Sequence, residues 1–443
     1  MKLKLLPSDS GDCLLLTGAE GRHVLVDGGE RSAYQRHVAA VLGRLRKKGE
    51  RLDVVYVSHI DSDHIAGVLQ MMDDLVAWRV RDFHANGGGG GNVSDPEVPR
   101  PPEVGQIWHN AFHEQVGKNA GPIGQTLAAR ATIFEGDPRK VFQDLAASSR
   151  RLANSQTEAI RLARRVGAKQ LGIPVNPPSQ HRLLFAREGG QGSIAVGGMR
   201  LRVLGPFERD LEKLRKEWND WLRTHQAQLD DLQAKARADE ERLGNAVERV
   251  IRPRLGQAEA LARGLKLVDG LGRRSEVTTP NLASLMLLVE EAGRTILLTG
   301  DGHWEDILKG LRQVGKLGAQ GGVHVNVLKV QHHGSEHNIK DEFVKAVTAD
   351  HYVFCGNGAN ENPDPRVVDL IARSRQAGSP VVGSTPEATT RPFKFWFNSS
   401  ESASVAAPAH MRAVEQQVRA LAQASGGRMR FSFQKTKPQV LTV

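Results

Sequence analysis

A short run between a buried strand and a helix carries four side chains that could bind metal ions. The chain places SHIDSDH at residues 58–64, after an apolar run and before a segment with helical spacing. Alternate side chains at a strand end point the same way, so we expect His59 and Asp61 to lie together. The turn that follows would bring Asp63 and His64 toward a neighbouring point. Imidazole and carboxylate ligands suit Zn²⁺, Mn²⁺ or Fe²⁺, so the spacing predicts two adjacent cations bridged by a water.

Two further strand ends carry the same residue types. Residues 296–301, ILLTGD, place Asp301 after a buried strand, and residues 327–335, VLKVQHHGS, place His332 and His333 after another. Either pattern alone is weak, because Gly-Asp commonly forms a turn and paired histidines are common at surfaces and in cores. Ligand sites in α/β sheets form at strand ends, so three such clusters favour convergence on one place. For the first cluster the alternative, a polar turn that caps a helix, would require both His and both Asp to gather by accident.

Strands and helices alternate around these clusters. Short apolar runs separated by turns predict strands at 2–6, 13–17, 23–27, 52–57, 193–196, 199–204, 285–290, 295–299, 325–330 and 351–355. Helical spacing predicts helices at 32–48, 65–75, 303–311 and 341–347. This order predicts a layered α/β architecture. We expect one core over 1–86, 193–206 and 276–400, insertions at 87–192 and 207–275, and a C-terminal helix and strand over 401–443.

The two expected insertions differ in charge. The first begins with Gly-rich and Pro-rich stretches, and its residues 118–187 hold 12 Lys/Arg against 4 Asp/Glu. Such a segment would attract a polyanion through counterion release, and the alternative is a solvated pair of basic helices. The range 208–264 balances 12 basic with 12 acidic residues and favours a helical hairpin packed over the core. A lid, a homo-oligomer arm and a docking surface for a partner protein all stay open for it.

Composition narrows the class of protein. The 443 residues include 60 Lys/Arg, 50 Asp/Glu and 40% apolar residues, a globular balance with a net charge of +10. Aromatic residues make up only 5%, which argues against a nucleic-acid binder built on stacking platforms. Two distant cysteines exclude a disulfide scaffold and a cysteine-rich zinc site. The chain lacks a signal-peptide pattern and any apolar run of about 18 residues, so we expect a cytoplasmic protein without membrane contact.

The motifs HIDSDH, LLTGD and LKVQHHGS together resemble those of the metallo-β-lactamase fold. More narrowly, they are similar to the subgroup with the soluble metal-binding domain of ComEC-type DNA-uptake proteins and the bacterial phosphorylcholine esterases. The opening SGDCLLL, the HVLVDGG that follows and NLASL at 281–285 are similar to that subgroup too. The resemblance covers 1–86, 193–206 and 276–370. It implies a four-layer αββα sandwich with two largely helical insertions and a dinuclear site along one edge of the sheets.

The resemblance also implies a ligand set for two divalent ions, Zn²⁺ or Mn²⁺. Carried over residue by residue, His59 and Asp61 hold the first ion, Asp63, His64 and His333 the second, and Asp301 both. Asp63 and Asp301 would act in catalysis by orienting the attacking group. His332 would contact phosphate or donate a proton, and the choice between His332 and His333 as ligand stays open. Two residues would line the pocket, namely Asp27, which orders a nearby loop, and Ser335, a turn hydroxyl.

Three positions depart from the pattern of the superfamily. The commoner motif has His in place of Asp61, and this change, which the subgroup shares, hardens the first site and favours Mn²⁺ beside Zn²⁺. Asn281 stands where the third motif has His, so Asn281 and Ser284 are expected as a weak ligand or as pocket residues. Residues 362–365, NPDP, replace a His-Pro-His element of the subgroup, so a catalytic role there is not expected.

The predicted function is metal-dependent hydrolysis. Two cations about 3.5–4 Å apart activate a bridging water and neutralise charge on a phosphoryl or carbonyl oxygen. The leading hypothesis is a phosphodiesterase or nuclease that cleaves DNA or RNA through a metal-bridged hydroxide, favoured by the resemblance, by Asp61 and by the basic range 118–187. One alternative is a hydrolase of a small phosphodiester or ester. The other is a degenerate, non-catalytic binding module, which Asn281 and Asn362 would explain.

Overall fold

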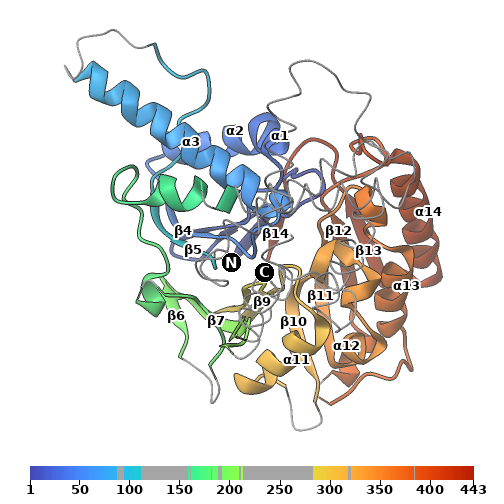
Figure 1. Cartoon of the computed structure of the whole chain (residues 1–443). Coiled ribbons are helices and arrows are strands. Elements are labelled where there is room, and N and C mark those ends of the chain that lie inside the picture. Colours follow the sequence, from blue (N-terminus) through green and yellow to red (C-terminus); the bar gives the residue numbers. More distant parts are fainter. Residues whose placement is uncertain are drawn as a thin grey trace, which may run out of the picture.

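The computed structural model of the chain describes residues 1–86, 94–110, 158–159, 161–180, 182–187, 192–208, 211–212, 283–317, 321–383 and 385–443. Two β-sheets lie face to face, and helices cover the outer face of each (Figure 1). The predicted α/β class with αββα layers is therefore confirmed for these residues. The ranges 87–93, 111–157 and 213–282, which hold much of the two expected insertions, lie outside the described residues.

The first sheet combines an antiparallel meander with parallel strands. Its order is β14-β1-β2-β3-β4-β5, with β1 Lys2–Leu5, β2 Leu14–Thr17, β3 His23–Val26, β4 Leu52–Tyr56, β5 Val104–Trp108 and β14 Gln439–Thr442. Short turns join β1, β2 and β3, so these strands pair antiparallel, whereas β4 follows a helix and pairs parallel to β3. The carboxyl ends of β3 and β4 consequently reach the same edge of the sheet.

The second sheet repeats this arrangement with more strands. Its order is β13-β12-β11-β10-β9-β8-β7-β6, with β6 Ile194–Val196, β7 Met199–Gly205, β8 Met286–Glu291, β9 Arg294–Leu298, β10 Val323–Lys329, β11 Val347–Phe354, β12 Phe393–Phe397 and β13 Met429–Phe433. The strands β7, β8 and β9 pair antiparallel, and β9, β10 and β11 pair parallel. The carboxyl ends of β9, β10 and β11 therefore lie next to one another.

Helices on the outer faces link the parallel strands. The first sheet carries α1 Arg31–Ala33, α2 Ala39–Lys47 and α3 Ser62–Ala85, with a π-helical turn at Tyr34–Val38 between α1 and α2. The second sheet carries α11 Trp304–Gln313, α12 Asp341–Ala346, α13 Pro365–Ser374 and α14 Pro408–Ala424 (Figure 1). Within the described ranges, every helix is too short or too polar to cross a membrane.

Three apolar clusters hold the four layers together. The middle cluster lies between the sheets, where Leu14 of β2 and Leu287 of β8 belong to the same buried group. The next residue along each strand faces the other way, so Leu15 packs with the helices of the first sheet and Leu288 with those of the second. Strands that are buried on both faces need apolar residues at nearly every position. This requirement explains the continuous apolar runs in the sequence.

Several elements extend beyond the ranges predicted from the sequence. The helix expected at 65–75 runs from Ser62 to Ala85 as α3, and its outer half packs little against the core, with Val80 and Phe83 exposed. The strand β5 lies within the range expected to be an insertion, yet it pairs with β4. The range 401–443 contains the expected helix, α14, and contributes one strand to each sheet, β13 to the second and β14 to the first.

Two glycines allow α3 to approach the loop after β3. A Cβ atom on Gly67 would lie 2.0 Å from the carbonyl oxygen of Gly28, and one on Gly28 would lie 2.2 Å from a backbone nitrogen of α3. The backbones also hydrogen bond here, since the amide of Gly28 donates to the carbonyl of His64 at 2.8 Å. Only residues without a side chain fit this approach. The contact fixes the first turn of α3 against the loop that carries Asp27.

We expect Gly67→Ala to lower the free energy of unfolding by about 1–3 kcal/mol, because the added methyl group would overlap the backbone of Gly28. Urea denaturation followed by circular dichroism measures this change. Gly192→Ala is the matched control, since a Cβ atom there meets no atom within 4 Å. The control should shift the free energy by less than about 0.5 kcal/mol. Equal effects of the two substitutions would contradict the close approach.

Candidate metal centre

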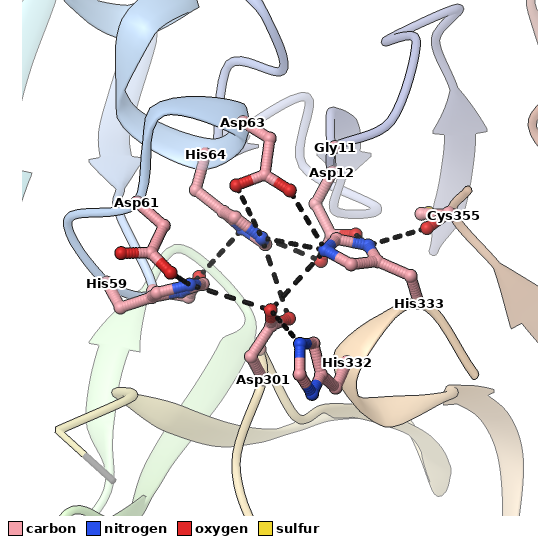
Figure 2. A network of polar contacts seen from close by, with 12 residues as sticks. Gly11, Asp12, His59, Asp61, Asp63, His64, Asp301, His332, His333 and Cys355 are labelled. Carbon is pink, nitrogen blue, oxygen red and sulfur yellow. Dashed lines mark hydrogen bonds and ion pairs between the residues drawn. The ribbon is translucent and has the colours of Figure 1, made fainter. Parts of the chain in front are cut away.

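The carboxylate of Asp301 lies at the centre of a buried cluster of imidazoles (Figure 2). Its Oδ2 is 3.6 Å from Nε2 of His59, 3.4 Å from Nε2 of His333 and 3.7 Å from Nε2 of His332. Its Oδ1 is 3.5 Å from Nε2 of His64. Only 2% of Asp301 is exposed. Four imidazoles therefore present the same ring nitrogen to one carboxylate.

These side chains reach the centre from both sheets. His59 follows β4, and the first turn of α3 supplies His64. Asp301 follows β9, and His332 and His333 follow β10. The convergence that the strand-end pattern predicts is thus present in the structure, while the roles of these residues as metal ligands stay predictions.

Two further predicted ligands form the side of the cluster that solvent reaches. The side chain of Asp61 is 32% exposed, and its Oδ2 lies 3.7 Å from Nε2 of His59. The side chain of Asp63 is 28% exposed, and its Oδ2 lies 3.1 Å from Nε2 of His333. Asp61 is also the N-cap residue of α3, and Asp63 lies in the first turn of that helix, where the helix dipole favours a negative charge.

The opposite ring nitrogen of three histidines has a fixed hydrogen-bond partner. Nδ1 of His333 lies 2.6 Å from the carbonyl oxygen of Cys355, which can only accept. Nδ1 of His64 lies 3.0 Å from Oδ2 of Asp27, and Nδ1 of His59 lies 3.1 Å from Oγ of Ser58. Each Nδ1 therefore donates its proton outward, so in the neutral ring, the form that binds metal ions, the lone pair of Nε2 is directed at Asp301. Histidine ligands of metal ions show this outer hydrogen bond almost without exception.

Backbone conformation explains how two consecutive histidines reach the same carboxylate. His332 has a φ of 46° and His333 a φ of 56°, both in the left-handed region. Nδ1 of His332 donates to Oδ1 of Asn338 at 2.6 Å, because the amide nitrogen of Asn338 is engaged by the carbonyl of Asp301 at 2.9 Å. An extended backbone would send the two rings to opposite sides. The turn therefore makes both histidines part of the centre.

Burial and charge act against each other on the pKa values of this cluster. Burial would lower the pKa of His64, but the carboxylates of Asp301 and Asp63 raise it well above its usual range. His333 behaves in the same way, with Asp301 as the main carboxylate. Conversely, burial would raise the pKa of Asp301, but His333 and His64 hold it well below its usual range. For His332 burial dominates, and its pKa is lowered.

A buried ion pair lies behind the imidazoles. The ammonium of Lys329 contacts the carboxylate of Asp12, donates to the carbonyl of Gly300 at 3.0 Å and lies 3.6 Å from Oδ1 of Asp301. Burial would raise the pKa of Asp12, but Lys329 and the nearby imidazoles lower it to about 2. Burial would lower the pKa of Lys329, but the two carboxylates raise it above its usual range. Both groups of the pair are therefore charged.

The donor set fits a divalent metal ion. Among the buried side-chain atoms of the described residues, Nε2 of His59 and Oδ1 of Asp301 make no hydrogen bond. Nε2 of His64 and Nε2 of His333 lie only 3.3 Å apart although both are directed at the same carboxylate. His59, His64 and Asp301 place ligand atoms within 4.8 Å of one another, as do Asp12, His64 and His333. With both rings neutral, these facing lone pairs would have no donor between them, and a bound cation would satisfy them.

The remaining predicted residues surround this centre. Asp27 is fully buried and accepts hydrogen bonds from the amide of Ser58 at 2.7 Å and from its hydroxyl at 2.8 Å. The hydroxyl of Ser284 accepts from the amide of Asp301 at 3.3 Å, which fixes the turn after β9. Ser335 accepts from the amide of His337 at 3.4 Å and so is a turn hydroxyl. Asn281 lies outside the described residues.

Sequence reasoning did not single out several residues that the structure places against the centre. Asp12 belongs to the SGDC stretch, and Lys329 is the one charged residue in the apolar run VLKV. A lysine inside a strand that is otherwise apolar needs a buried partner, so this position carried a detectable pattern. No sequence pattern marks the carbonyl of Cys355 or the amide of Asn338, because their roles depend on the tertiary fold.

Comparison with known families agrees with this geometry. Residues 7–77 match the family model described as "Metallo-beta-lactamase superfamily". The matched stretch includes Asp12, Asp27 and the loop 58–64. This stretch is therefore similar to the superfamily, and the arrangement of two sheets is consistent with the metallo-β-lactamase fold. Members of the superfamily are generally hydrolases and typically bind divalent metal ions.

The solved structures similar to this chain include Zn(2+)-bound PqqB from Methylobacterium extorquens. The alignment covers 100% of each chain with 9% sequence identity and a TM-score of 0.32. A likeness at this level carries no inference about the activity or the metal of this chain. No curated protein matches the chain at a significant level.

We expect Asp27→Asn to weaken the binding of Zn²⁺ by about 10–100-fold, because the amide nitrogen cannot accept the hydrogen bonds that orient Ser58 and His64. Isothermal titration calorimetry on metal-stripped protein measures the dissociation constant. The matched control is Asp350→Asn, since Asp350 also lies against a histidine and an asparagine, His324 at 3.0 Å and Asn326 at 3.2 Å, but in another part of the fold. Wild-type affinity in the Asp27 variant would contradict its orienting role.

Proposed function

We propose that the chain is a metal-dependent phosphodiesterase, with DNA or RNA as its leading substrate class. The observation that carries the proposal is the buried carboxylate of Asp301, which faces four imidazoles, with Asp61 and Asp63 at the solvent side. When bound there, divalent ions supply a nucleophile from water at neutral pH and neutralise the charge that gathers on a phosphoryl oxygen. The superfamily match and its general hydrolytic chemistry support this assignment.

The charges of the centre support two ions. Five carboxylates, those of Asp12, Asp27, Asp61, Asp63 and Asp301, contact the histidines of the centre. The ammonium of Lys329 neutralises one of them. Because metal binding requires neutral histidines, a metal-loaded centre would hold four negative charges, which two divalent cations would balance. The carboxylates are hard oxygen ligands, which favours Mn²⁺ beside Zn²⁺.

Each side chain of the centre would have its own role in holding the ions or contacting the substrate. His59 and Asp61 would hold one ion, His64, His333 and Asp63 the other, and Asp301 both. Asp63 also reaches the solvent side, where its carboxylate would orient an attacking water. His332 is more open to solvent than the other three histidines, with 27% of its side chain exposed. It would therefore contact the phosphate or its leaving oxygen.

The choice of a nucleic acid over a small diester rests on the sequence. The motifs around the centre resemble those of the soluble domain of ComEC-type DNA-uptake proteins. The range 118–187 holds 12 basic and 4 acidic residues, which would favour contact with a polyanion through counterion release. Residues 118–157 of this range lie outside the described residues, so contact between the range and the centre is part of the proposal.

We expect wild-type protein supplied with Mn²⁺ or Zn²⁺ to cleave DNA or RNA strands, and Asp63→Ala to lower the rate by about 100-fold or more, because loss of even an outer partner of a metal ligand costs 10–100-fold. Gel assays with single-stranded DNA, double-stranded DNA and RNA measure strand cleavage, and a chromogenic diester measures turnover of a small substrate. Asp341→Ala is the matched control, since Asp341 lies in the first turn of α12 and pairs with Lys345.

The outcomes separate the candidate functions. Strand cleavage that requires metal and Asp63 supports the nuclease. Turnover of the chromogenic diester without strand cleavage favours a hydrolase of a small phosphodiester or ester instead. Inactivity toward every substrate, with intact folding and less than one ion bound per chain, would favour a binding module and contradict the proposal.

A further inference from the structure

A buried lysine lies directly behind the candidate metal centre. Lys329 is the last residue of β10, and 2% of its side chain is exposed. Its ammonium contacts Asp12, donates to the carbonyl of Gly300 at 3.0 Å and lies 3.6 Å from Oδ1 of Asp301. No step of the proposed reaction uses this group. Its place in the structure therefore needs its own explanation.

The three contacts of Lys329 join three chain segments. Asp12 lies in the loop between β1 and β2 of the first sheet, and Gly300 lies in the turn between β9 and Asp301. Lys329 itself precedes His333 by one short turn. The hydroxyl of Thr299 donates to the carbonyl of Lys329 at 2.7 Å, so the ends of β9 and β10 are bound at both the backbone and the ammonium.

The carboxylate of Asp12, which pairs with Lys329, also contacts the predicted metal ligand His333. Oδ1 of Asp12 lies 3.3 Å from Nδ1 of His333, on the side of the ring that faces away from the centre, where the same nitrogen donates to the carbonyl of Cys355 at 2.6 Å. Asp12 itself is 1% exposed. The pair therefore reaches Asp301 through the ammonium and His333 through the carboxylate.

Filling space in a protein core with an ion pair costs free energy. Apolar residues of similar volume often serve a core equally well or better, because two charges lose their hydration on burial. Stability alone therefore gives no reason for a lysine and an aspartate at this point. Their position, in contact with one carboxylate and one imidazole of the centre, supplies a reason.

We propose that Asp12 and Lys329 form a positioning pair for the metal centre, in which the ammonium fixes the carboxylate of Asp301 and the carboxylate fixes the ring of His333. This inference rests on the metal site of the proposed function. The competing explanation is that the two charges only neutralise each other. The two explanations differ in what happens when both charges are removed together.

The decisive variant is the double substitution Asp12→Asn with Lys329→Met. It preserves approximate side-chain volume, and it removes one negative and one positive charge, so the net charge of the centre is unchanged. Metal-stripped wild type, the double variant and Lys329→Met are titrated with Zn²⁺ by calorimetry, and Co²⁺ absorption spectra report the ligand geometry. Lys345→Met is the matched control, because Lys345 pairs with Asp341 on the surface of α12.

We expect the double variant to bind Zn²⁺ about 10–100-fold more weakly than wild type, the range seen for outer partners of metal ligands, and to alter the Co²⁺ spectrum. Urea denaturation of the metal-free proteins shows whether each variant is folded. Lys329→Met leaves Asp12 without its cation and is expected to be the less stable protein. If that single variant does not fold, the double variant still decides the question.

Wild-type affinity and an unchanged spectrum in the folded double variant would overturn the inference. A wild type that binds no Zn²⁺ would overturn it together with the proposed metal site. A wild type that binds metal in the predicted way but cleaves no phosphodiester would refute the proposed substrate and leave the positioning role to be judged on the affinities alone.

Discussion

The structure depends on the burial of one carboxylate, Asp301, where the two sheets meet. A charged carboxylate removed from water is costly unless cations or hydrogen-bond donors surround it. One ammonium lies beside it here, and four imidazoles face it with ring nitrogens that would share a divalent cation with it. Each of these groups comes from a strand end or from the first turn of a helix, and each has a fixed partner on its outer side. The strand ends, turns and glycine contacts together place the groups that the buried carboxylate of Asp301 needs around it.

The two sheets share a topology that explains why the predicted ligands meet. In each sheet an antiparallel meander leads into a parallel strand through a helix on the outer face. Parallel strands direct all their carboxyl ends to one edge, and the two sheets bring those edges together. Asp27 and the loop 58–64 then come from the first sheet, and Asp301 and His333 come from the second. The centre is therefore built across the interface between two similar halves.

Much of this arrangement could be predicted from the sequence because it has a local cause. Apolar runs that end in His or Asp mark strand ends, and strand ends are where α/β sheets place their ligands. The outer half of α3 escaped prediction because it packs little against the core, so that even its apolar residues Val80 and Phe83 are exposed. Whether His332, His333 or both face Asp301 could not be decided from the sequence. The answer depends on left-handed backbone angles that no pattern of residue types reveals. Asp12 joins the centre from a distant loop, a contact that only the tertiary fold creates.

The division of the ligands between the two halves has a consequence for how the chain matures. During synthesis the loop 58–64 emerges long before Asp301 and His333, which follow more than two hundred residues later. An unfinished chain can therefore offer His59, Asp61, Asp63 and His64 to a metal ion, but it cannot enclose that ion. Only a chain that has been translated past β10 and has closed one sheet upon the other provides the complete set of ligands. Binding of an ion at this centre would consequently be coupled to completion of the fold, and tight retention of that ion would mark a finished molecule.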